Sequence, residues 1–202
     1  MTVSRSVSFF ENQFQRQVAG GEFALNPFEA AALEFVSGKV LDLGCGLGNL
    51  SIAAARQGAS VTAIDASPTA VDRINAVARE DNLPLRALCE DLSTYVITRQ
   101  YDTIIAIGLL MFFSRTRALA LLSDIQRQVA PGGHAIINTL IEGTSYMDMF
   151  ESGNFCLLAR GELEQLFAGW TLIQVQHQEF SAPGDSVKAF VTLVARKSGT
   201  AI

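Results

Sequence analysis

The sequence predicts an α/β protein built on a doubly wound, mostly parallel sheet. Apolar segments of strand length alternate with amphipathic segments of helical periodicity, as a parallel sheet covered by helices requires. A glycine-rich loop follows the first predicted strand and opens a helix. The 202 residues leave room for one domain of ordinary size. We therefore expect a single doubly wound domain.

Capping and turn residues divide the chain into its expected elements. Asn26, Pro27 and Glu29 supply an N-cap, a proline at the first helical position and an acidic first turn, so a helix should run to about Ser37. Gly38 then ends it. The predicted strands are residues 39–43, 60–65, 85–89, 101–108, 133–140, 171–180 and 187–196, with further helices up to residue 58 and over 116–129 and 161–168.

Charge and hydropathy disfavour several classes of function. The 15 basic and 20 acidic residues give a net charge of -5 without a basic stripe, so we expect no nucleic-acid partner. Every apolar run is interrupted well short of the roughly 20 residues that span a bilayer, so we expect no membrane association. The N-terminus lacks a secretory signal and the three cysteines form no Cys-x-x-Cys pair, which predicts a cytoplasmic protein with reduced thiols and no metal site.

The segment 40–51, Val-Leu-Asp-Leu-Gly-Cys-Gly-Leu-Gly-Asn-Leu-Ser, is the most informative part of the chain. Its three alternating glycines allow a ligand to lie against main-chain N–H groups at the mouth of a helix. Asn49 replaces the last glycine of the dinucleotide fingerprint, and Asp42 would repel a pyrophosphate. S-adenosylmethionine, with its ammonium group and ribose, suits this loop better. The expected contacts are Asp42, Gly44, Cys45, Gly46, Gly48 and Asn49.

Two further acids follow the second and third strands. Asp65 lies about 20 residues beyond the glycine loop, where open α/β folds place an acid that accepts hydrogen bonds from ribose hydroxyls. Ser67 is available to cap the next helix, which leaves Asp65 for the ribose, with Ala66 along the adenine edge. Asp91 is positioned to accept the adenine amino proton, with Leu92 beside the ring; a solvated loop carboxylate is the alternative.

Together these residues resemble the class I S-adenosylmethionine-dependent methyltransferases, and the resemblance covers most of the chain. It implies a Rossmann-like methyltransferase fold with a seven-stranded, mostly parallel sheet and an antiparallel C-terminal hairpin. It also implies that the glycine loop contacts the methionine end of the cofactor. After the fourth strand, Ile107, Gly108 and Met111 are expected to complete the cofactor site.

A narrower resemblance begins at Tyr101, where Tyr-Asp-Thr-Ile-Ile-Ala-Ile-Gly-Leu-Leu-Met-Phe-Phe is similar to the strand-four segment of the tellurite-resistance methyltransferase family. Five later segments resemble the same family and follow in the same order along the chain. They are residues 131–133, 141–146, 160–163, 169–170 and 193–197. The chain departs from it at residues 176–180, where the family carries a basic segment with His and Arg beside its substrate. Only His177 matches in part. The missing arginine weakens attraction for an oxyanion such as tellurite, so the substrate is not carried over.

Two apolar segments and two polar side chains are candidates for the acceptor side. Methyl transfer is an in-line displacement that depends on positioning and exclusion of water. A small-molecule acceptor with sulfur, selenium or tellurium can react as an anion without a base, which fits the scarcity of histidine. We expect residues 109–113 and 146–150 to wall the acceptor pocket, with core packing as the alternative. The candidate catalytic residues are Tyr146 and His177, and a structural role for His177 is an equal alternative.

Residues 1–25 are expected to form a lid on the cofactor-binding domain, residues 26–202. Phe9, Phe10 and Phe14 recur at helical spacing before a Gly20-Gly21 hinge, where they would help to exclude water. An oligomer contact is the alternative, and we expect a monomer or a homodimer. Two other functions stay open: a domain that binds the cofactor without catalysis, and a nicotinamide-dependent oxidoreductase, which Asp42 and the lack of a Tyr-x-x-x-Lys pair disfavour.

Overall fold

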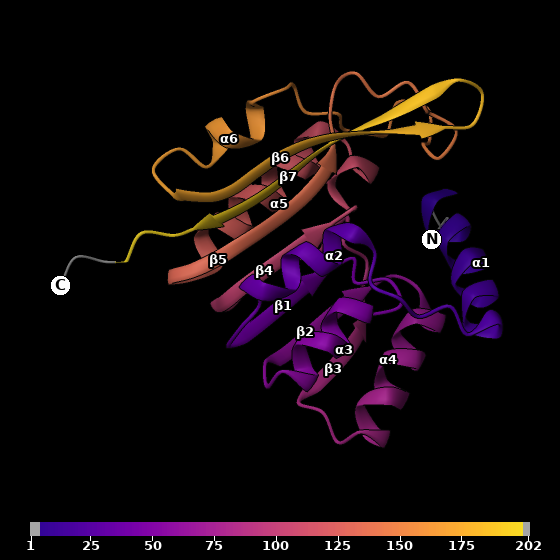
Figure 1. The fold of residues 1–202 in the computed structure, drawn as a ribbon, viewed down its shortest axis with the longest axis vertical. Coiled ribbons are helices and arrows are strands. Elements are labelled where there is room, and N and C mark those ends of the chain that lie inside the picture. The colour runs from indigo at the N-terminus through magenta and orange to yellow at the C-terminus, as the bar shows by residue number, and fades with distance from the viewer. Residues whose placement is uncertain (1–4, 200–202) are drawn as a thin grey trace.

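The computed structural model describes residues 5–199 and has the predicted α/β architecture (Figure 1). One sheet holds all seven named strands in the order β3-β2-β1-β4-β5-β7-β6. The first five run parallel, whereas β7 lies antiparallel between β5 and β6. The strands are β1 (Lys39–Leu43), β2 (Ser60–Asp65), β3 (Leu85–Cys89), β4 (Tyr101–Ile107), β5 (Val129–Leu140), β6 (Thr171–Ala182) and β7 (Ser186–Arg196). The antiparallel C-terminal hairpin is confirmed.

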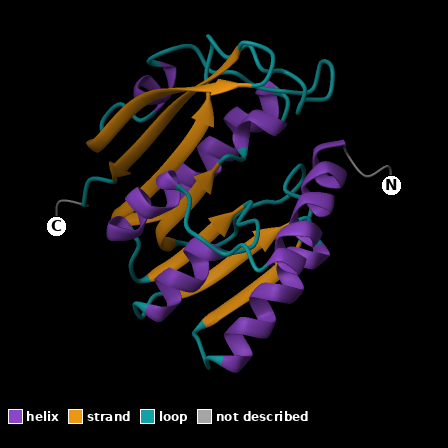
Figure 2. Cartoon of the chain, turned by 45° about the vertical axis from the view of Figure 1, so that its right-hand side comes forward, coloured by secondary structure: helices purple, strands orange, loops and turns teal. Residues whose placement is uncertain are grey.

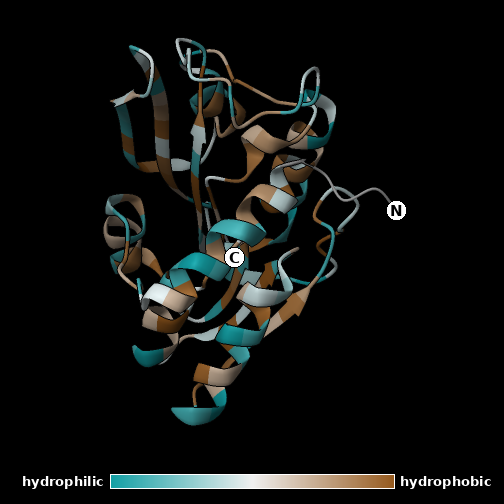
Figure 3. Ribbon diagram, turned by 90° about the vertical axis from the view of Figure 1, so that its right-hand side faces the viewer, coloured by the Kyte–Doolittle hydropathy of each residue, from teal (hydrophilic) through white to brown (hydrophobic). Residues whose placement is uncertain are grey.

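Helices cover both faces of this sheet (Figure 2). Side chains alternate between the faces along each strand, so on β5 Ile136 and Ile137 belong to different cores. The helices themselves alternate hydrophobic and hydrophilic residues (Figure 3), as the amphipathic pattern predicted. One core includes α2 (Pro27–Ala32), the 3₁₀ turn η1 (Leu33–Phe35), α3 (Asn49–Arg56) and α4 (Pro68–Glu80), and the other includes α5 (Arg115–Gln128) and α6 (Glu162–Leu166).

The first helix, α1 (Arg5–Gly20), stands apart from these layers. Its main helical neighbour is α4, and it lies beside the end of the sheet where the glycine loop emerges. Among residues 5–199, no helix is long and apolar enough to cross a bilayer.

Two element boundaries differ from the sequence-based prediction by more than two residues. The helix expected to reach Ser37 ends at Ala32 and continues as the 3₁₀ turn η1, a common way for a helix to tighten at its C-terminus. Strand β5 starts at Val129 rather than Gly133, because pairing of Val129 with Tyr101 and main-chain bonds between Gly132, Gly133 and Lys197 keep the Pro-Gly-Gly segment in the sheet. Local turn residues alone did not reveal these tertiary contacts.

Candidate functional site

A cleft of about 850 Å³ lies at the carboxyl ends of the parallel strands, the edge where open α/β sheets bind ligands. All the predicted cofactor-binding residues except Gly48 line this cleft. A Cβ atom on Gly48 would lie 2.4 Å from Ile74 Cγ1, and its φ is +72°. Gly48 therefore lets α3 pack closely on α4, and its contact with the cofactor stays a prediction.

Main-chain hydrogen bonds hold the glycine loop against β2. The N–H groups of Gly44 and Cys45 donate to the carbonyl oxygen of Ile64 at 2.8 and 3.1 Å. Gly44 has a φ of +67°, and a Cβ atom there would lie 2.9 Å from Leu109 Cδ1. Glycine is therefore required at this position both for conformation and for the close approach of the loop after β4.

Asp42 and Asp65 place a buried and a partly buried carboxylate beside this loop. Asp42 is 3% exposed and accepts a 2.6 Å hydrogen bond from Ser51 Oγ. Burial raises the pKa of Asp42 to about 7, despite the Ser51 bond, and the charges of Glu29 and Asp65 add to the rise. A cation bound in the cleft would favour the ionised form of Asp42.

Asp65 is held by the main chain on both sides of its carboxylate. Its Oδ2 accepts from Gly46 N and its Oδ1 from Ser67 N, both at 2.9 Å. Burial raises the pKa of Asp65, while these backbone bonds oppose the rise. A carboxylate has about four lone-pair sites, so Asp65 retains capacity for a ligand's hydroxyl groups.

The loop after β3 is held in place by Arg117 of α5 and by hydrogen bonds within the loop itself. Asp91 lines the cleft, and its Oδ1 accepts a 2.8 Å bond from Ser93 N. The guanidinium of Arg117 donates to the carbonyl oxygens of Leu92 and Tyr95 at 2.6 to 3.0 Å. These contacts hold Asp91 and Leu92 just beyond the end of β3, where both residues line the cleft.

Helix α1 covers part of the cleft and is anchored through a glutamate. Glu11 accepts hydrogen bonds from the hydroxyls of Ser67 and Thr69, both at 2.5 Å, at the start of α4. The ring of Phe10 meets that of Phe112 edge-on, with centroids 5.2 Å apart. The cleft-lining residues of α1 are Ser6, Val7, Phe10, Gln13, Phe14 and Gln17.

The predicted acceptor walls lie only partly in the cleft. Four residues of segment 109–113 line it, whereas Leu110 is buried in the core at 1% exposure. From segment 146–150 only Met149 lines the cleft. Tyr146 does not, but its ring centroid lies 4.6 Å from Nζ of Lys188, which does. The cleft-lining residues of the first segment are Leu109, Met111, Phe112 and Phe113.

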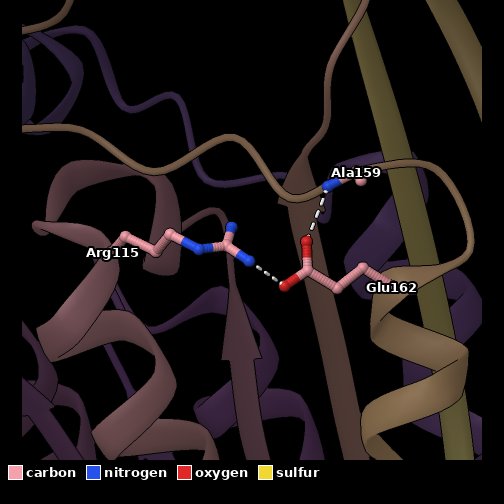
Figure 4. Close-up of polar contacts among 3 residues, drawn as sticks. All are labelled: Arg115, Ala159 and Glu162. Atoms are coloured by element: carbon pink, nitrogen blue, oxygen red, sulfur yellow. Dashed lines mark hydrogen bonds and ion pairs between the residues drawn. The ribbon is translucent and has the colours of Figure 1, made fainter.

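The long connection between β5 and α6 reaches the cleft through Met149 and Asn154. Its far end is fixed by Glu162, which pairs with Arg115 and accepts a 2.8 Å bond from Ala159 N (Figure 4). Nearer the cleft, Cys156 N donates to the Met111 carbonyl oxygen at 3.1 Å. These contacts hold an irregular segment against the loop that follows β4.

His177 lies outside the cleft. Its Nε2 is 2.9 Å from Glu164 Oε1, so it links β6 to α6. The geometry supports the structural alternative for this residue rather than a catalytic one. Sequence reasoning missed several cleft-lining side chains, namely Phe28, Glu29, Asn138, Lys188 and Phe190. The usable signals were a polar residue late in an apolar strand, Asn138, and a lone lysine in the hairpin, Lys188.

Comparison with known proteins agrees with this geometry. The family model for "Tellurite resistance protein TehB" matches residues 5–181. The chain belongs to the TehB family. It is 32% identical over 80% of its length to hemagglutinin 1 of Eikenella corrodens, and 26% identical over 79% to a probable S-adenosyl-L-methionine-dependent methyltransferase TehB of Haemophilus influenzae (strain 10810). It spans only 55% and 57% of these two relatives.

Solved structures show the TehB fold directly. The crystal structure of TehB from Haemophilus influenzae superposes with a TM-score of 0.76 at 23% identity, covering 94% of this chain and 67% of that one. The N-methyltransferase NodS from Bradyrhizobium japonicum, in complex with S-adenosyl-L-homocysteine, gives a TM-score of 0.69 at 16% identity over 96% of this chain and 99% of that one. The seven-stranded, Rossmann-like methyltransferase fold is therefore confirmed.

The charges of this TehB-family cleft suit a cationic cofactor. Within the described residues, one basic side chain lines it, that of Lys188. The acids create a negative potential that attracts a sulfonium or an ammonium group. The site thus fits S-adenosylmethionine on its charge and on its glycine cradle. The acidic residues that line the cleft are Glu22, Glu29, Asp42, Asp65 and Asp91.

Proposed function

We propose that this protein transfers a methyl group from S-adenosylmethionine to a small-molecule acceptor that reacts through a soft nucleophile. The observation that carries the proposal is the meeting of the glycine loop, Asp42 and Asp65 in one acidic cleft. Membership of the TehB family supports it, since relatives in this family are named as S-adenosylmethionine-dependent methyltransferases.

In the proposed site each acid has a separate role. Asp65 accepts hydrogen bonds from the ribose hydroxyls, and Asp91 with Leu92 faces the adenine. Asp42 draws the ammonium end of the cofactor toward the glycine loop. The lining residues Cys45, Asn49, Ala66, Ile107, Gly108 and Met111 complete the surface around the cofactor.

The bound cofactor supplies an electrophilic methyl group on a sulfonium. A lone pair of the acceptor forms the new bond to this methyl, while the electrons of the broken S–CH₃ bond stay on the cofactor sulfur as a neutral thioether. The acceptor loses its proton to solvent beforehand. The protein holds the two reactants in line and keeps water out.

The side chains of the cleft support a soft acceptor. No histidine, and no other neutral nitrogen base, lines it among the described residues. Oxygen and nitrogen acceptors commonly need a base, whereas a thiolate or a selenium or tellurium anion does not. We therefore assign no general base.

Helix α1 serves as the lid in this proposal. Residues 1–25 form the lid segment, of which residues 1–4 lie outside the described part. The Glu11 anchor docks α1 on α4, and Phe10 and Phe14 cover the cleft. Docking of these rings excludes water from the reacting atoms.

Calorimetric titration with S-adenosylmethionine and NADH, followed by a transfer assay, tests the proposed function. The assay measures S-adenosylhomocysteine formed with thiol, selenite, tellurite and phenol acceptors. We expect binding of S-adenosylmethionine alone and transfer to at least one soft acceptor. Binding of NADH instead would identify an oxidoreductase. Binding of S-adenosylmethionine without transfer to any acceptor would identify a non-catalytic binding domain.

A further inference from the structure

Asn138 is a buried polar side chain whose amide is only half satisfied. It is 1% exposed and lies near the carboxyl end of β5, where it lines the cleft. Its Nδ2 donates to Thr192 Oγ1 at 2.9 Å, and its Oδ1 has no partner. Buried polar atoms are nearly always hydrogen-bonded, so an unpaired one that faces a cleft indicates a ligand.

Lys188 is the second polar feature of the same face. Phe190 and Thr192 share its side of β7, because side chains alternate along a strand. Thr192 pairs with Asn138, so Lys188 lies four residues, roughly 13 Å, farther out along the hairpin. Its ammonium lies over the ring of Tyr146 and forms no ion pair with a carboxylate of the described residues. A cation without a counterion is therefore available at the outer end of the cleft.

Apolar side chains line the cleft between Asn138 and Lys188. Phe28 and Phe190 lie with ring centroids 5.0 Å apart, and Leu140 follows Asn138 on the same face of β5. The inner end borders the cofactor, because Asn138 pairs with Ile107, the residue before Gly108. A molecule lying here would have a polar group toward the cofactor, an apolar body, and a second polar group near Lys188.

We propose that the acceptor is an organic anion with a ring-sized apolar body, selected by Lys188 and positioned by Asn138. This inference rests on the proposed methyltransferase function. The charged group of the acceptor binds Lys188 and stays unmodified. The nucleophilic atom lies at the Asn138 end, where it attacks the methyl group. Lys188 overcomes the repulsion that the five acids of the cleft exert on such an anion.

A matched pair of thiols tests this selection at pH 8. 4-Mercaptobenzoate carries a carboxylate opposite its thiol, and 4-methylbenzenethiol has the same ring without the charge. We expect kcat/KM for the charged thiol to be at least tenfold higher in the unmodified protein. Lys188→Met should remove this preference by lowering kcat/KM for 4-mercaptobenzoate toward that for 4-methylbenzenethiol. Lys188→Arg should restore most of the preference, and the distant control Lys39→Met should leave it intact.

Asn138→Leu has a different expected signature. It should lower kcat/KM for both thiols by about tenfold. The Asn138 amide can turn so that its Oδ1 accepts from the Thr192 hydroxyl and its Nδ2 donates to the thiolate, and either thiol loses this hydrogen bond in the variant. Thermal unfolding checks that the variant stays folded. An Asn138→Leu protein that is folded and fully active toward both thiols would contradict the positioning role.

A binding readout keeps the inference independent of turnover. The methylated products, 4-(methylthio)benzoate and 4-(methylthio)toluene, are titrated into the protein saturated with S-adenosylhomocysteine. We expect the charged product to bind at least tenfold tighter, and this difference to vanish in Lys188→Met. Equal affinities in the unmodified protein would overturn the organic-anion proposal, even where cofactor titration upholds the methyltransferase function.

Discussion

The proposed cofactor half and the proposed acceptor half of the cleft are built in contrasting ways. The cofactor half uses short loops that follow β1, β2 and β3 in chain order, each fixed by main-chain hydrogen bonds. The acceptor half combines α1, α2, the irregular residues 141–160 and the C-terminal hairpin, so Phe28 and Phe190 meet from opposite ends of the chain. Cofactor recognition is thus encoded locally, whereas acceptor recognition depends on tertiary assembly. The two should respond separately to mutation.

The largest effect should come from Asp65→Ala in the cofactor half. It removes the proposed acceptor for two ribose hydroxyls. Each bond to a charged group contributes about 1.5–3 kcal/mol, so affinity for S-adenosylmethionine should fall at least 100-fold. Titration calorimetry measures this loss. Asp72→Ala, an exposed acid on α4 outside the cleft, is the control and should bind normally. Unchanged affinity in Asp65→Ala would remove the ribose assignment.

Glu11→Ala should affect both halves at once, because it releases α1. Loss of its bonds to Ser67 and Thr69 should lower kcat about tenfold while the melting temperature stays nearly constant. Asn12→Ala changes an exposed position on the same helix and should have normal kcat. If the two variants behave alike, α1 is not a lid and an oligomer contact becomes the better explanation.

The pKa of Asp42 predicts a pH dependence confined to the cofactor half. Its folded value of about 7 exceeds the ordinary 3.8, so the folded protein binds this proton more strongly and the free energy of unfolding decreases as pH rises from about 4 to 7. A cationic ligand needs the ionised form. S-adenosylmethionine should therefore bind about tenfold more weakly at pH 6 than at pH 8.

Asp42→Asn provides the check on this pH dependence. The variant should bind S-adenosylmethionine with the same affinity at both pH values and should be more stable than the parent protein at pH 8. Chemical denaturation at pH 5 and pH 8 measures the stability difference. A parent protein whose cofactor affinity does not vary with pH would show that Asp42 does not sense the cation.

The smallest effect should come from His177→Ala. The side chain bonds Glu164 outside the cleft, so turnover should be unchanged, and the lost contact should cost about 1 kcal/mol of folding stability. Glu164→Ala should behave in the same way, since it removes the other half of the pair. A tenfold loss of kcat with His177→Ala alone would return this histidine to the list of catalytic candidates.

The same contrast explains what could be predicted from sequence. The glycine loop, the position of Asp65 and the alternation of strands with helices follow from periodicity and fixed spacing, which report local structure. Asn138 and Lys188 were not singled out, because their roles depend on tertiary contacts. Asn138 is hydrogen-bonded to Thr192 on another strand, and Lys188 reaches the cleft only because the C-terminal hairpin extends past it. The packing role of Gly48 could not be predicted for a related reason, since its neighbour Ile74 lies on a different helix.

Ser67 connects the two halves through three hydrogen bonds. Its N–H donates to Asp65, its hydroxyl donates to Glu11 of α1, and the same hydroxyl accepts from Ala70 N. The residue that orients Asp65, the acid proposed to bind the ribose, thus also anchors α1, the proposed lid. A ribose bound to Asp65 would therefore also stabilise the docking point of α1. The position of Ser67 between Asp65 and Glu11 favours a compulsory kinetic order. In this order the methyl donor binds first and the acceptor second, and the methylated product leaves before S-adenosylhomocysteine.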